Sequence, residues 1–265
     1  MDKERLISKI MEKPELREIP IEDVEMAISL CIKKDSSDEE VISRARKLLH
    51  DVYGAFGSRK LLVQGKNKER DPEWILRKHL STRERLPHYN TIYSRILGNF
   101  KGTIFDLGAG VNGFSLGFIP KVKYVGIEGI GQLVNLMNNY FHTQKNVNAK
   151  TIHLSLFQLE KIKNLIKKEG NLSKRGQVKG KKIVFLFKVL DSLEMLKKNY
   201  SKELLLEISP LVERVVVSFA TESFNKRTRF KVKRYWLINF IQENFKITDD
   251  FEIGGERYIV FENKK

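Results

Sequence analysis

The sequence is poor in cysteine and contains no long apolar run. Its one cysteine, Cys31, excludes an internal disulfide framework and is typical of proteins from a reducing compartment. No uncharged apolar stretch reaches the roughly 18 residues that a membrane-spanning helix needs. The N-terminal stretch MDKERLISKIMEKPELREIP is too charged for a secretory signal. We therefore expect a cytoplasmic protein that does not act at a membrane, and we expect it to be a monomer.

Acidic residues are too few to balance the basic ones. The chain has 49 Lys and Arg against 33 Asp and Glu, which gives a formal net charge of +16. Such an excess favours a polyanionic partner, because each phosphate that the protein neutralises releases counterions. The positive charge gathers in residues 161–182 and 225–234. A solvated surface would also explain charge clusters, but the second one is interleaved with aromatic residues, which favours contact with RNA.

Apolar residues at three- and four-residue spacing predict helices in the first part of the chain, at residues 21–33, 39–53, 72–79 and 89–97. From residue 102 the pattern changes to short β-branched and aromatic runs, TIFDLG, YVGIEG, KIVFLFKVLD and RVVVSFA. Helical patterns separate these runs at residues 132–141, 192–199 and 233–243. Residues 161–182 read instead as a long exposed loop or the tail of a helix.

The C-terminal stretch FKITDDFEIGGERYIVFENKK predicts an antiparallel hairpin with its turn at Gly254 and Gly255. Buried parallel strands joined by helices indicate a doubly wound sheet. We therefore expect an α/β fold with two parts. Residues 1–100 form an all-helical extension, and residues 101–265 form a Rossmann-like domain.

Residues 105–115, FDLGAGVNGFS, contain the pattern G-x-G-x-x-G at Gly108, Gly110 and Gly113. After a strand and before a helix, this pattern forms a turn that lets a nucleotide approach the backbone at the carboxyl ends of the strands. Glu128 ends the next predicted strand, where a carboxylate can accept both hydroxyls of a ribose. NAD and S-adenosylmethionine both carry an adenosine ribose, so these residues fit either.

Asp106 distinguishes between NAD and S-adenosylmethionine as the expected cofactor. It precedes the first glycine and would repel the pyrophosphate of a dinucleotide, whereas it would attract the ammonium and sulfonium of S-adenosylmethionine. The alternative is that Asp106 only caps the following turn. We therefore favour a methyl-donor site.

Four motifs together are similar to a known family: HLSTRERL (residues 79–86), FDLGAGVNGFS, FLFKVLDSLE (residues 185–194) and VVSFATES (residues 216–223). In order and spacing the chain resembles the aminoglycoside-resistance 16S rRNA methyltransferases, the Rmt or FmrO family. The resemblance implies a class I S-adenosylmethionine-dependent methyltransferase fold. It also implies methylation of guanine N7 in the small ribosomal subunit, with the helical N-terminal part docking on rRNA.

The resemblance implies roles for particular residues. Arg85 would pair with the carboxylate of the methionine moiety, Glu128 would hold the ribose, and Lys188 matches a family lysine that follows the fourth strand. We expect the cofactor site to comprise Arg85, Asp106, Gly108, Ala109, Gly110, Glu128, Ser155, Leu156 and Phe187. We expect contacts with RNA from Lys174, Arg175, Ser218, Phe219, Lys226, Arg227, Arg229 and Lys231. His79 is expected to support Arg85, and no His or Cys cluster suggests a metal.

The chain departs from the family pattern at a few positions. Ser155 or Gln158 stands where an acidic residue often reads the adenine edge, and Ala220 replaces a proline. Asp191 also replaces a proline, close to the expected site of methyl transfer, and we place it with Lys188 among the candidate catalytic residues. A carboxylate there would help an amino nitrogen to react, which allows methylation of cytosine N4. Alternatively, Asp191 caps a helix that begins at Ser192.

The sequence thus predicts a methyltransferase that uses S-adenosylmethionine to modify a base nitrogen of 16S rRNA, either guanine N7 or cytosine N4. A housekeeping modification is as compatible with these residues as drug protection. Two other hypotheses remain at this point. One is a tRNA methyltransferase of the same fold, and the other is a non-enzymatic RNA-binding factor for ribosome assembly.

Overall fold

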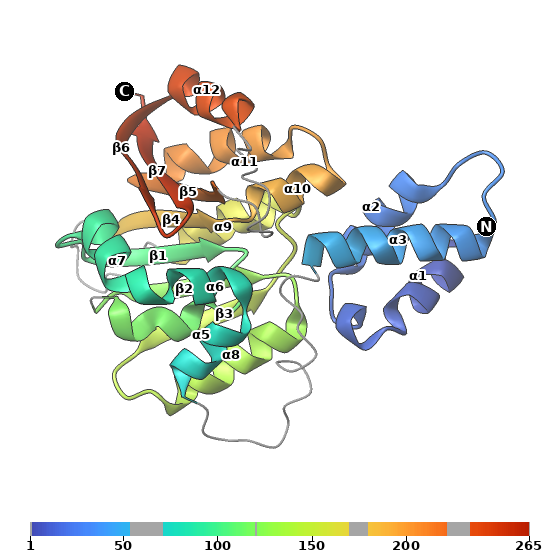
Figure 1. Ribbon diagram of the computed structural model, residues 1–265, viewed down its shortest axis with the longest axis horizontal. Helices are drawn as coiled ribbons and strands as arrows, with labels where there is room; N and C mark the ends of the chain where they lie inside the picture. Colours follow the sequence, from blue (N-terminus) through green and yellow to red (C-terminus); the bar gives the residue numbers. More distant parts are fainter. Residues whose placement is uncertain (1, 54–70, 120, 170–179, 222–233, 265) are drawn as a thin grey trace.

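The structure is a computed structural model that describes residues 2–53, 71–119, 121–169, 180–221 and 234–264 (Figure 1). At its centre is a seven-stranded sheet with the order β3-β2-β1-β4-β5-β7-β6. The parallel strands are β1 (Gly102–Leu107), β2 (Lys123–Glu128), β3 (Asn148–His153), β4 (Lys181–Phe187) and β5 (Arg214–Ala220). β7 (Glu256–Asn263) pairs antiparallel with both β5 and β6 (Phe245–Ile253), as the predicted hairpin requires.

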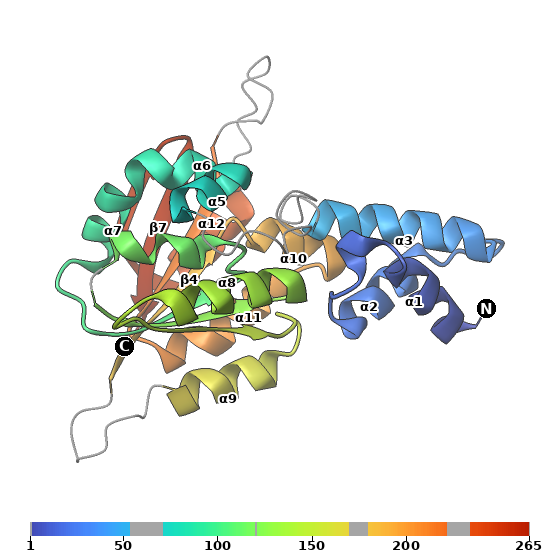
Figure 2. The ribbon, with the colours of Figure 1, turned by 90° about the horizontal axis from the view of Figure 1, so that it is seen from below.

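The central strands are apolar on both faces because helices cover both faces. On one face, α7 (Tyr89–Leu97) and α8 (Gly131–Thr143) pack in a core with Ile104 and Phe185. On the other, α9 (Leu159–Glu169), α11 (Tyr200–Ile208) and α12 (Tyr235–Asn244) pack on Phe105 and Val184. Figure 2 shows α7 and α9 on opposite sides of the sheet. Among the described residues, a ligand can therefore approach the sheet at the ends of its strands.

The N-terminal helices fall into two sets (Figure 1). The helices α1 (Lys3–Met11), α2 (Ile21–Cys31) and α3 (Asp38–Tyr53) pack on one another beside the sheet, with the short 3-10 helix η1 (Pro14–Leu16) between the first two. Both α2 and α3 contact α10 (Leu190–Leu196), which follows β4. The second set, α5 (Pro72–Lys78), α6 (Leu80–Arg85) and η2 (Leu86–His88), leads into α7. The predicted division at residue 100 stays a prediction.

Most predicted elements are confirmed within a few residues. Residues 161–182 were expected to be a loop or the tail of a helix. Residues 161–169 do form the end of a helix, the amphipathic α9, which begins at Leu159 and buries Ile162 and Ile166. Residues 170–179 lie outside the described residues, and Lys181 already begins β4. The glycine-rich turn leads into a 3-10 helix, η3 (Asn112–Phe118), rather than an α-helix. α10 begins at Leu190, before the predicted start, so Asp191 lies within its first turn. The structure also contains α1, β3, α11 and the 3-10 helix η4 (Ser209–Leu211), which the sequence pattern did not single out.

Candidate cofactor site

The glycine-rich turn lies where β1 ends beside β2. Gly108 and Gly110 have φ angles of 74° and 54°, in the region that glycine alone adopts readily. The amides of Gly108 and Ala109 donate to the carbonyl of Ile127 at 2.8 and 3.1 Å, which ties the turn to β2. A Cβ on Gly108 would lie 2.6 Å from a methyl carbon of Val189. The turn therefore brings bare backbone to the carboxyl ends of the strands, as the sequence predicts.

Glu128, at the end of β2, is fully buried beside this turn. Its carboxylate accepts the amides of Gly110 at 2.7 Å and Ile130 at 2.8 Å. Burial raises the pKa of Glu128, and these backbone hydrogen bonds oppose that shift. A carboxylate offers about four lone-pair sites, so Glu128 retains acceptors for further donors such as ribose hydroxyls.

Two clefts meet at Gly108. The first, of about 470 Å³, is lined on the sheet side by Gly108, Glu128, Gly129, Leu156, Phe157, Val189, Ser192 and Leu193. Asp23, Val52 and Tyr53 of the N-terminal helices line its other wall. The second cleft, of about 240 Å³, is lined by His79, Ser81, Thr82, Arg85, Asp106, Gly108, Ala109, Gly110, Val111, Asn112 and Phe187. Both clefts therefore border the glycine-rich turn at Gly108.

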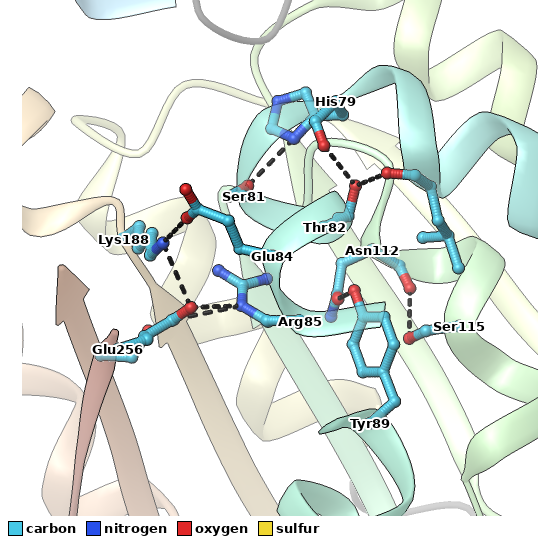
Figure 3. Close-up of polar contacts among 12 residues, drawn as sticks. His79, Ser81, Thr82, Glu84, Arg85, Tyr89, Asn112, Ser115, Lys188 and Glu256 are labelled. Carbon is cyan, nitrogen blue, oxygen red and sulfur yellow. Dashed lines mark hydrogen bonds and ion pairs between the residues drawn. The ribbon is translucent and has the colours of Figure 1, made fainter. Parts of the chain in front are cut away.

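Arg85 is the buried cation of the second cleft. Its Nε donates to both carboxylate oxygens of Glu256, at 3.1 and 2.9 Å (Figure 3). One of its terminal nitrogens, Nη2, is buried without a hydrogen-bond partner among the described residues. Burial opposes the charge of Arg85, but the Glu256 carboxylate outweighs it and raises the arginine pKa. Arg85 thus keeps a donor for an anionic group of a ligand.

Lys188 shares the Glu256 carboxylate with Arg85. Its Nζ lies 2.7 Å from a carboxylate oxygen of Glu84 and 3.3 Å from one of Glu256 (Figure 3). The backbone of Lys188 has a φ of 55°, which is unusual for a residue with a side chain and which turns the chain sharply after β4. Glu256 therefore forms ion pairs with both Arg85, a candidate cofactor-binding residue, and Lys188, a candidate catalytic residue.

Asp106 lies at the inner end of the second cleft, buried beneath the turn. One oxygen accepts Nδ2 of Asn112 at 2.8 Å and the hydroxyl of Tyr124 at 2.7 Å. The Tyr89 hydroxyl in turn donates to Oδ1 of Asn112 at 2.8 Å (Figure 3). Burial raises the pKa of Asp106, and these hydrogen bonds oppose the shift. Asp106 and Arg85 thus give one cleft two groups of opposite charge.

Asp191 lies in the first turn of α10. Its neighbours Val189 and Ser192 line the first cleft, whereas Asp191 is not among the lining residues of either cleft. Its carboxylate is paired with Arg234, whose Nε donates to the two oxygens at 2.8 and 2.9 Å. Arg234 also donates to the Ala220 carbonyl at 2.8 Å, so the pair ties α10 to the end of β5. The interpretation of Asp191 as the cap of a helix starting at Ser192 is wrong, because the helix starts earlier and Val189 is its N-cap.

The two residues predicted to meet the adenine edge both contact α2. The Ser155 hydroxyl donates to Asp23 at 2.5 Å, and the Gln158 amide donates to Glu22. Leu156 lines the first cleft and Phe187 the second, and their contact with a cofactor stays a prediction. The structure therefore brings the predicted cofactor residues together, with Ser155 beside the first cleft rather than among its lining residues.

The candidate RNA contacts are only partly described. Ser218 and Phe219 are buried at the end of β5, where Ser218 donates to Glu256 and Phe219 lies 5.1 Å from the Arg234 guanidinium. Their contact with RNA stays a prediction. The other predicted RNA contacts lie outside the described residues: Lys174, Arg175, Lys226, Arg227, Arg229 and Lys231.

Four residues of the site were missed from the sequence: Asp23, Tyr53, Asn112 and Glu256. Asn112 lies inside the glycine-rich motif, and Glu256 directly follows the predicted Gly254-Gly255 turn, so both positions offered a signal. Asp23 and Tyr53 lie in predicted helices, and no sequence pattern marks either of them as a site residue. Within the described ranges no helix is long and apolar enough to cross a membrane, and no group of three metal-ligating side chains gathers.

Comparison with known proteins identifies similar sequences and folds. No family model matches the chain. A 16S rRNA (guanine(1405)-N(7))-methyltransferase of Micromonospora rosea is 25% identical over 217 residues, which cover 74% of this chain and 72% of that protein. The 16S rRNA methyltransferase RmtF, crystallised with S-adenosyl-L-homocysteine, matches with a TM-score of 0.76 and 22% identity over 100% of both chains. The 16S rRNA methylase RmtB matches with a TM-score of 0.73 and 19% identity, over 100% of this chain and 99% of that one.

These matches span the helical N-terminal part as well as the sheet, since they extend over the whole chain. They confirm the predicted fold class, an α/β methyltransferase fold with a helical N-terminal extension. They also confirm the resemblance inferred from the four motifs: in sequence and in fold, this chain is similar to the aminoglycoside-resistance 16S rRNA methyltransferases.

Proposed function

We propose that this protein is an S-adenosylmethionine-dependent methyltransferase that methylates guanine N7 of 16S rRNA in the small ribosomal subunit. The observation that carries the proposal is the pair of clefts that share Gly108 in their walls, with the Glu128 carboxylate in one and Arg85 with Asp106 in the other. The methyltransferases among the similar proteins, one of them bound to S-adenosyl-L-homocysteine, agree with the predicted enzyme class and cofactor.

The residues of the two clefts fit the parts of S-adenosylmethionine. Glu128 retains acceptors for the ribose hydroxyls. In the second cleft, Nη2 of Arg85 has no hydrogen-bond partner within the described part of the chain and suits a carboxylate, while Asp106 suits an ammonium group. An amino acid moiety carries both of those charges, whereas a pyrophosphate would meet Asp106 unfavourably.

The reaction needs positioning more than acid–base chemistry. When bound, S-adenosylmethionine supplies an electrophilic methyl group on a sulfonium. Guanine N7 has an in-plane lone pair and no proton to lose, so a nitrogen–carbon bond forms as the carbon–sulfur bond breaks. The task of this chain is then to orient the donor and exclude water around the transfer. Buried Arg85 and Asp106 serve the first purpose, and the aromatic ring of Phe187 at the cleft wall serves the second.

Lys188 is proposed to position the site rather than to take a proton. Its ammonium lies between two carboxylates, those of Glu84 and Glu256, and forms an ion pair with each. Through Glu256 it helps to fix Nε of Arg85, while Nη2 of Arg85 has no hydrogen-bond partner among the described residues.

The cytosine N4 hypothesis has no support from the similar proteins, one of which is named for methylation of guanine N7. The local geometry also disfavours it, because the Asp191 carboxylate is engaged by the fork of Arg234. An acceptor for a base amino group would first have to leave that ion pair.

The proposal is tested with purified protein, labelled S-adenosylmethionine and unmodified small subunits. The rRNA is then digested and its nucleosides are identified by mass spectrometry, with tRNA and protein-free 16S rRNA as parallel substrates. N7-methylguanosine in 16S rRNA is the expected product. Methylated cytidine would overturn the choice of atom, methylation of tRNA alone would overturn the substrate, and unmethylated RNA in every reaction would overturn the enzymatic function. An Arg85→Ala variant serves as the negative control.

A further inference from the structure

The first cleft contains a second buried carboxylate, which comes from the N-terminal helices rather than from the sheet. Asp23 is carried by α2 and its side chain has no exposed surface. Glu128 enters the same cleft from the end of β2. Adenosine offers two sets of donors, the ribose hydroxyls and the amino group on the adenine ring. A site with two separate carboxylates matches these two sets.

The position of Asp23 is fixed by hydroxyl groups from both sides. Ser155, in the loop after β3, donates to Oδ1 of Asp23 at 2.5 Å, and the hydroxyl of Tyr53 donates to Oδ2. Both donors are neutral, and each leaves a lone pair on the oxygen to which it donates. Asp23 is therefore a buried acceptor that remains able to accept a hydrogen bond from a ligand in the cleft.

Ser155 explains why this carboxylate comes from α2. Glu128 pairs with His153 at the end of β3, so the loop after β3 lies beside the carboxylate that is proposed to hold the ribose. In this chain that loop presents the hydroxyl of Ser155, whose own hydrogen bond places Asp23 next to it. The Ser155 oxygen also accepts the Phe157 amide at 3.0 Å, so the loop is held rigidly around the hydroxyl.

The same contacts dock the N-terminal helices onto the sheet. The ring of Tyr53 packs so closely on the backbone after β2 that a Cβ on Gly129 would lie 3.0 Å from it. Nearby, the Gly131 amide donates to the Glu18 carbonyl at 2.9 Å, and Gln132 donates to the Pro14 carbonyl at 3.1 Å. The docking interface therefore surrounds the first cleft, and a ligand bound there touches both parts of the chain.

We propose that Asp23 binds the amino group on the adenine ring of the cofactor, so that cofactor binding and docking of the helical N-terminal part are coupled. The inference rests on the proposed function, because it assigns a contact within the same cofactor site. By linkage, a ligand that contacts both parts stabilises the docked arrangement to the extent that it prefers it. Asp23 is then the residue that selects adenine.

The test compares two ligands that differ only at this edge of the purine ring: S-adenosylhomocysteine and S-inosylhomocysteine, in which a carbonyl oxygen replaces the amino group and N1 carries a hydrogen. Their dissociation constants are measured by calorimetry on the full chain. A hydrogen bond to a charged group predicts that the wild type prefers the adenosyl ligand about ten- to hundredfold. In Asp23→Asn, whose amide can donate to a carbonyl, the preference should fall to about onefold or reverse.

Controls separate this role from a purely structural one. Glu25→Gln makes the same acid-to-amide change on α2, at an exposed ion pair with Lys3, and should keep the wild-type preference. Tyr53→Phe, which removes one hydroxyl from Asp23, should weaken the binding of both ligands yet keep the direction of the preference. If Asp23 had only a structural role, Asp23→Asn would bind both ligands more weakly than the wild type does. The ratio of the two dissociation constants would then be unchanged.

The possible failures are distinguishable. If Asp23→Asn keeps the wild-type preference for the adenosyl ligand, this inference is overturned while the proposed function stands. If the wild type binds the two ligands equally, adenine recognition by Asp23 is likewise overturned. If the wild type binds neither ligand, the proposed function falls and this inference falls with it.

Discussion

Arg85 and Glu256 form an ion pair in the core of the protein, with 2.9 Å between Nε and a carboxylate oxygen and with side chains 3% and 1% exposed. The two residues lie 171 positions apart in the chain, so the pair joins α6 to the hairpin strand β7. Because the pair is buried, the stability of the protein is sensitive to the loss of either partner. Such a loss leaves an uncompensated charge in a poorly solvated environment.

We therefore predict that Glu256→Gln lowers the free energy of unfolding by about 3–5 kcal/mol, as for other broken buried pairs. The matched control is Asp249→Asn, which breaks the more exposed pair of Arg95 and Asp249 on the neighbouring strand. That change should cost less than about 1 kcal/mol. Urea denaturation of the two variants and the wild type measures the difference. If both variants lost the same free energy of unfolding, burial of the Arg85–Glu256 pair would not determine how much that pair contributes to stability.

Gly108 gives a second prediction, which concerns the shape of the site. Its φ of 74° and the 2.6 Å approach of a Cβ to Val189 mean that Gly108→Ala introduces both backbone strain and a clash. We expect a loss of about 1–3 kcal/mol in unfolding free energy and weaker binding of S-adenosylhomocysteine. Calorimetry and thermal denaturation measure both effects.

Gly117→Ala is the control for that change. Nothing lies within 4 Å of a Cβ at Gly117, and its φ is outside the left-handed region. Its effect on stability should stay within about 1 kcal/mol. If the two alanine variants bound S-adenosylhomocysteine equally well, the conformation of Gly108 would not be what shapes the site.

The parts of the site that sequence predicts are those with a local cause. The glycine-rich motif can be recognised in the sequence because a tight turn at Gly108 and Gly110 requires residues without a Cβ. The strands can be predicted because burial on both faces of the sheet requires continuous apolar runs, as in β4. Helix α9 was predicted only as a loop or the tail of a helix because positive charge gathers in residues 161–182, although Ile162 and Ile166 repeat at helical spacing.

The contacts that sequence does not predict join residues far apart in the chain. Asp23 and Ser155 are separated by 132 positions, and neither occurs in a pattern that names the other. The same holds for Arg85 and Glu256. The resemblance predicted that Arg85 meets the cofactor, whereas the partner that orients its guanidinium emerges only once β7 is placed beside β5. Long-range pairing of this kind is decided by the packing of the whole fold.

A third prediction concerns Asp191. Since methylation of guanine N7 needs no group to accept a proton, Asp191→Asn should keep activity on small subunits within about tenfold of the wild type, whereas loss of a general base typically costs about 10²–10⁴-fold. Initial rates of methyl incorporation, with mass spectrometry of the product, measure this. A loss of that larger size together with methylated cytidine would restore Asp191 as the acceptor and overturn the choice of guanine N7.

His79 gives the last prediction, which concerns pH. Burial, with the nearby charges of Arg85 and Lys188, lowers the pKa of His79 from 6.5 to about 3. The unfolded chain therefore binds a proton near pH 6.5, whereas the folded protein does not bind it until about pH 3. Because the unfolded state holds more protons between these values, His79 makes stability fall as the pH falls through that window, by at most about 1.4 kcal/mol per pH unit.

The measurement is the free energy of unfolding of the wild type and of His79→Gln as a function of pH. Above pH 7 the two curves should run parallel, and below about pH 6.5 the wild type should lose stability more steeply than the variant. His142→Gln, at an exposed position near the end of α8, should follow the wild type throughout. Parallel curves for His79→Gln down to pH 4 would mean that the folded protein protonates His79 as readily as the unfolded chain does. The ring would then be solvated beside Arg85, and the second cleft would be open to water.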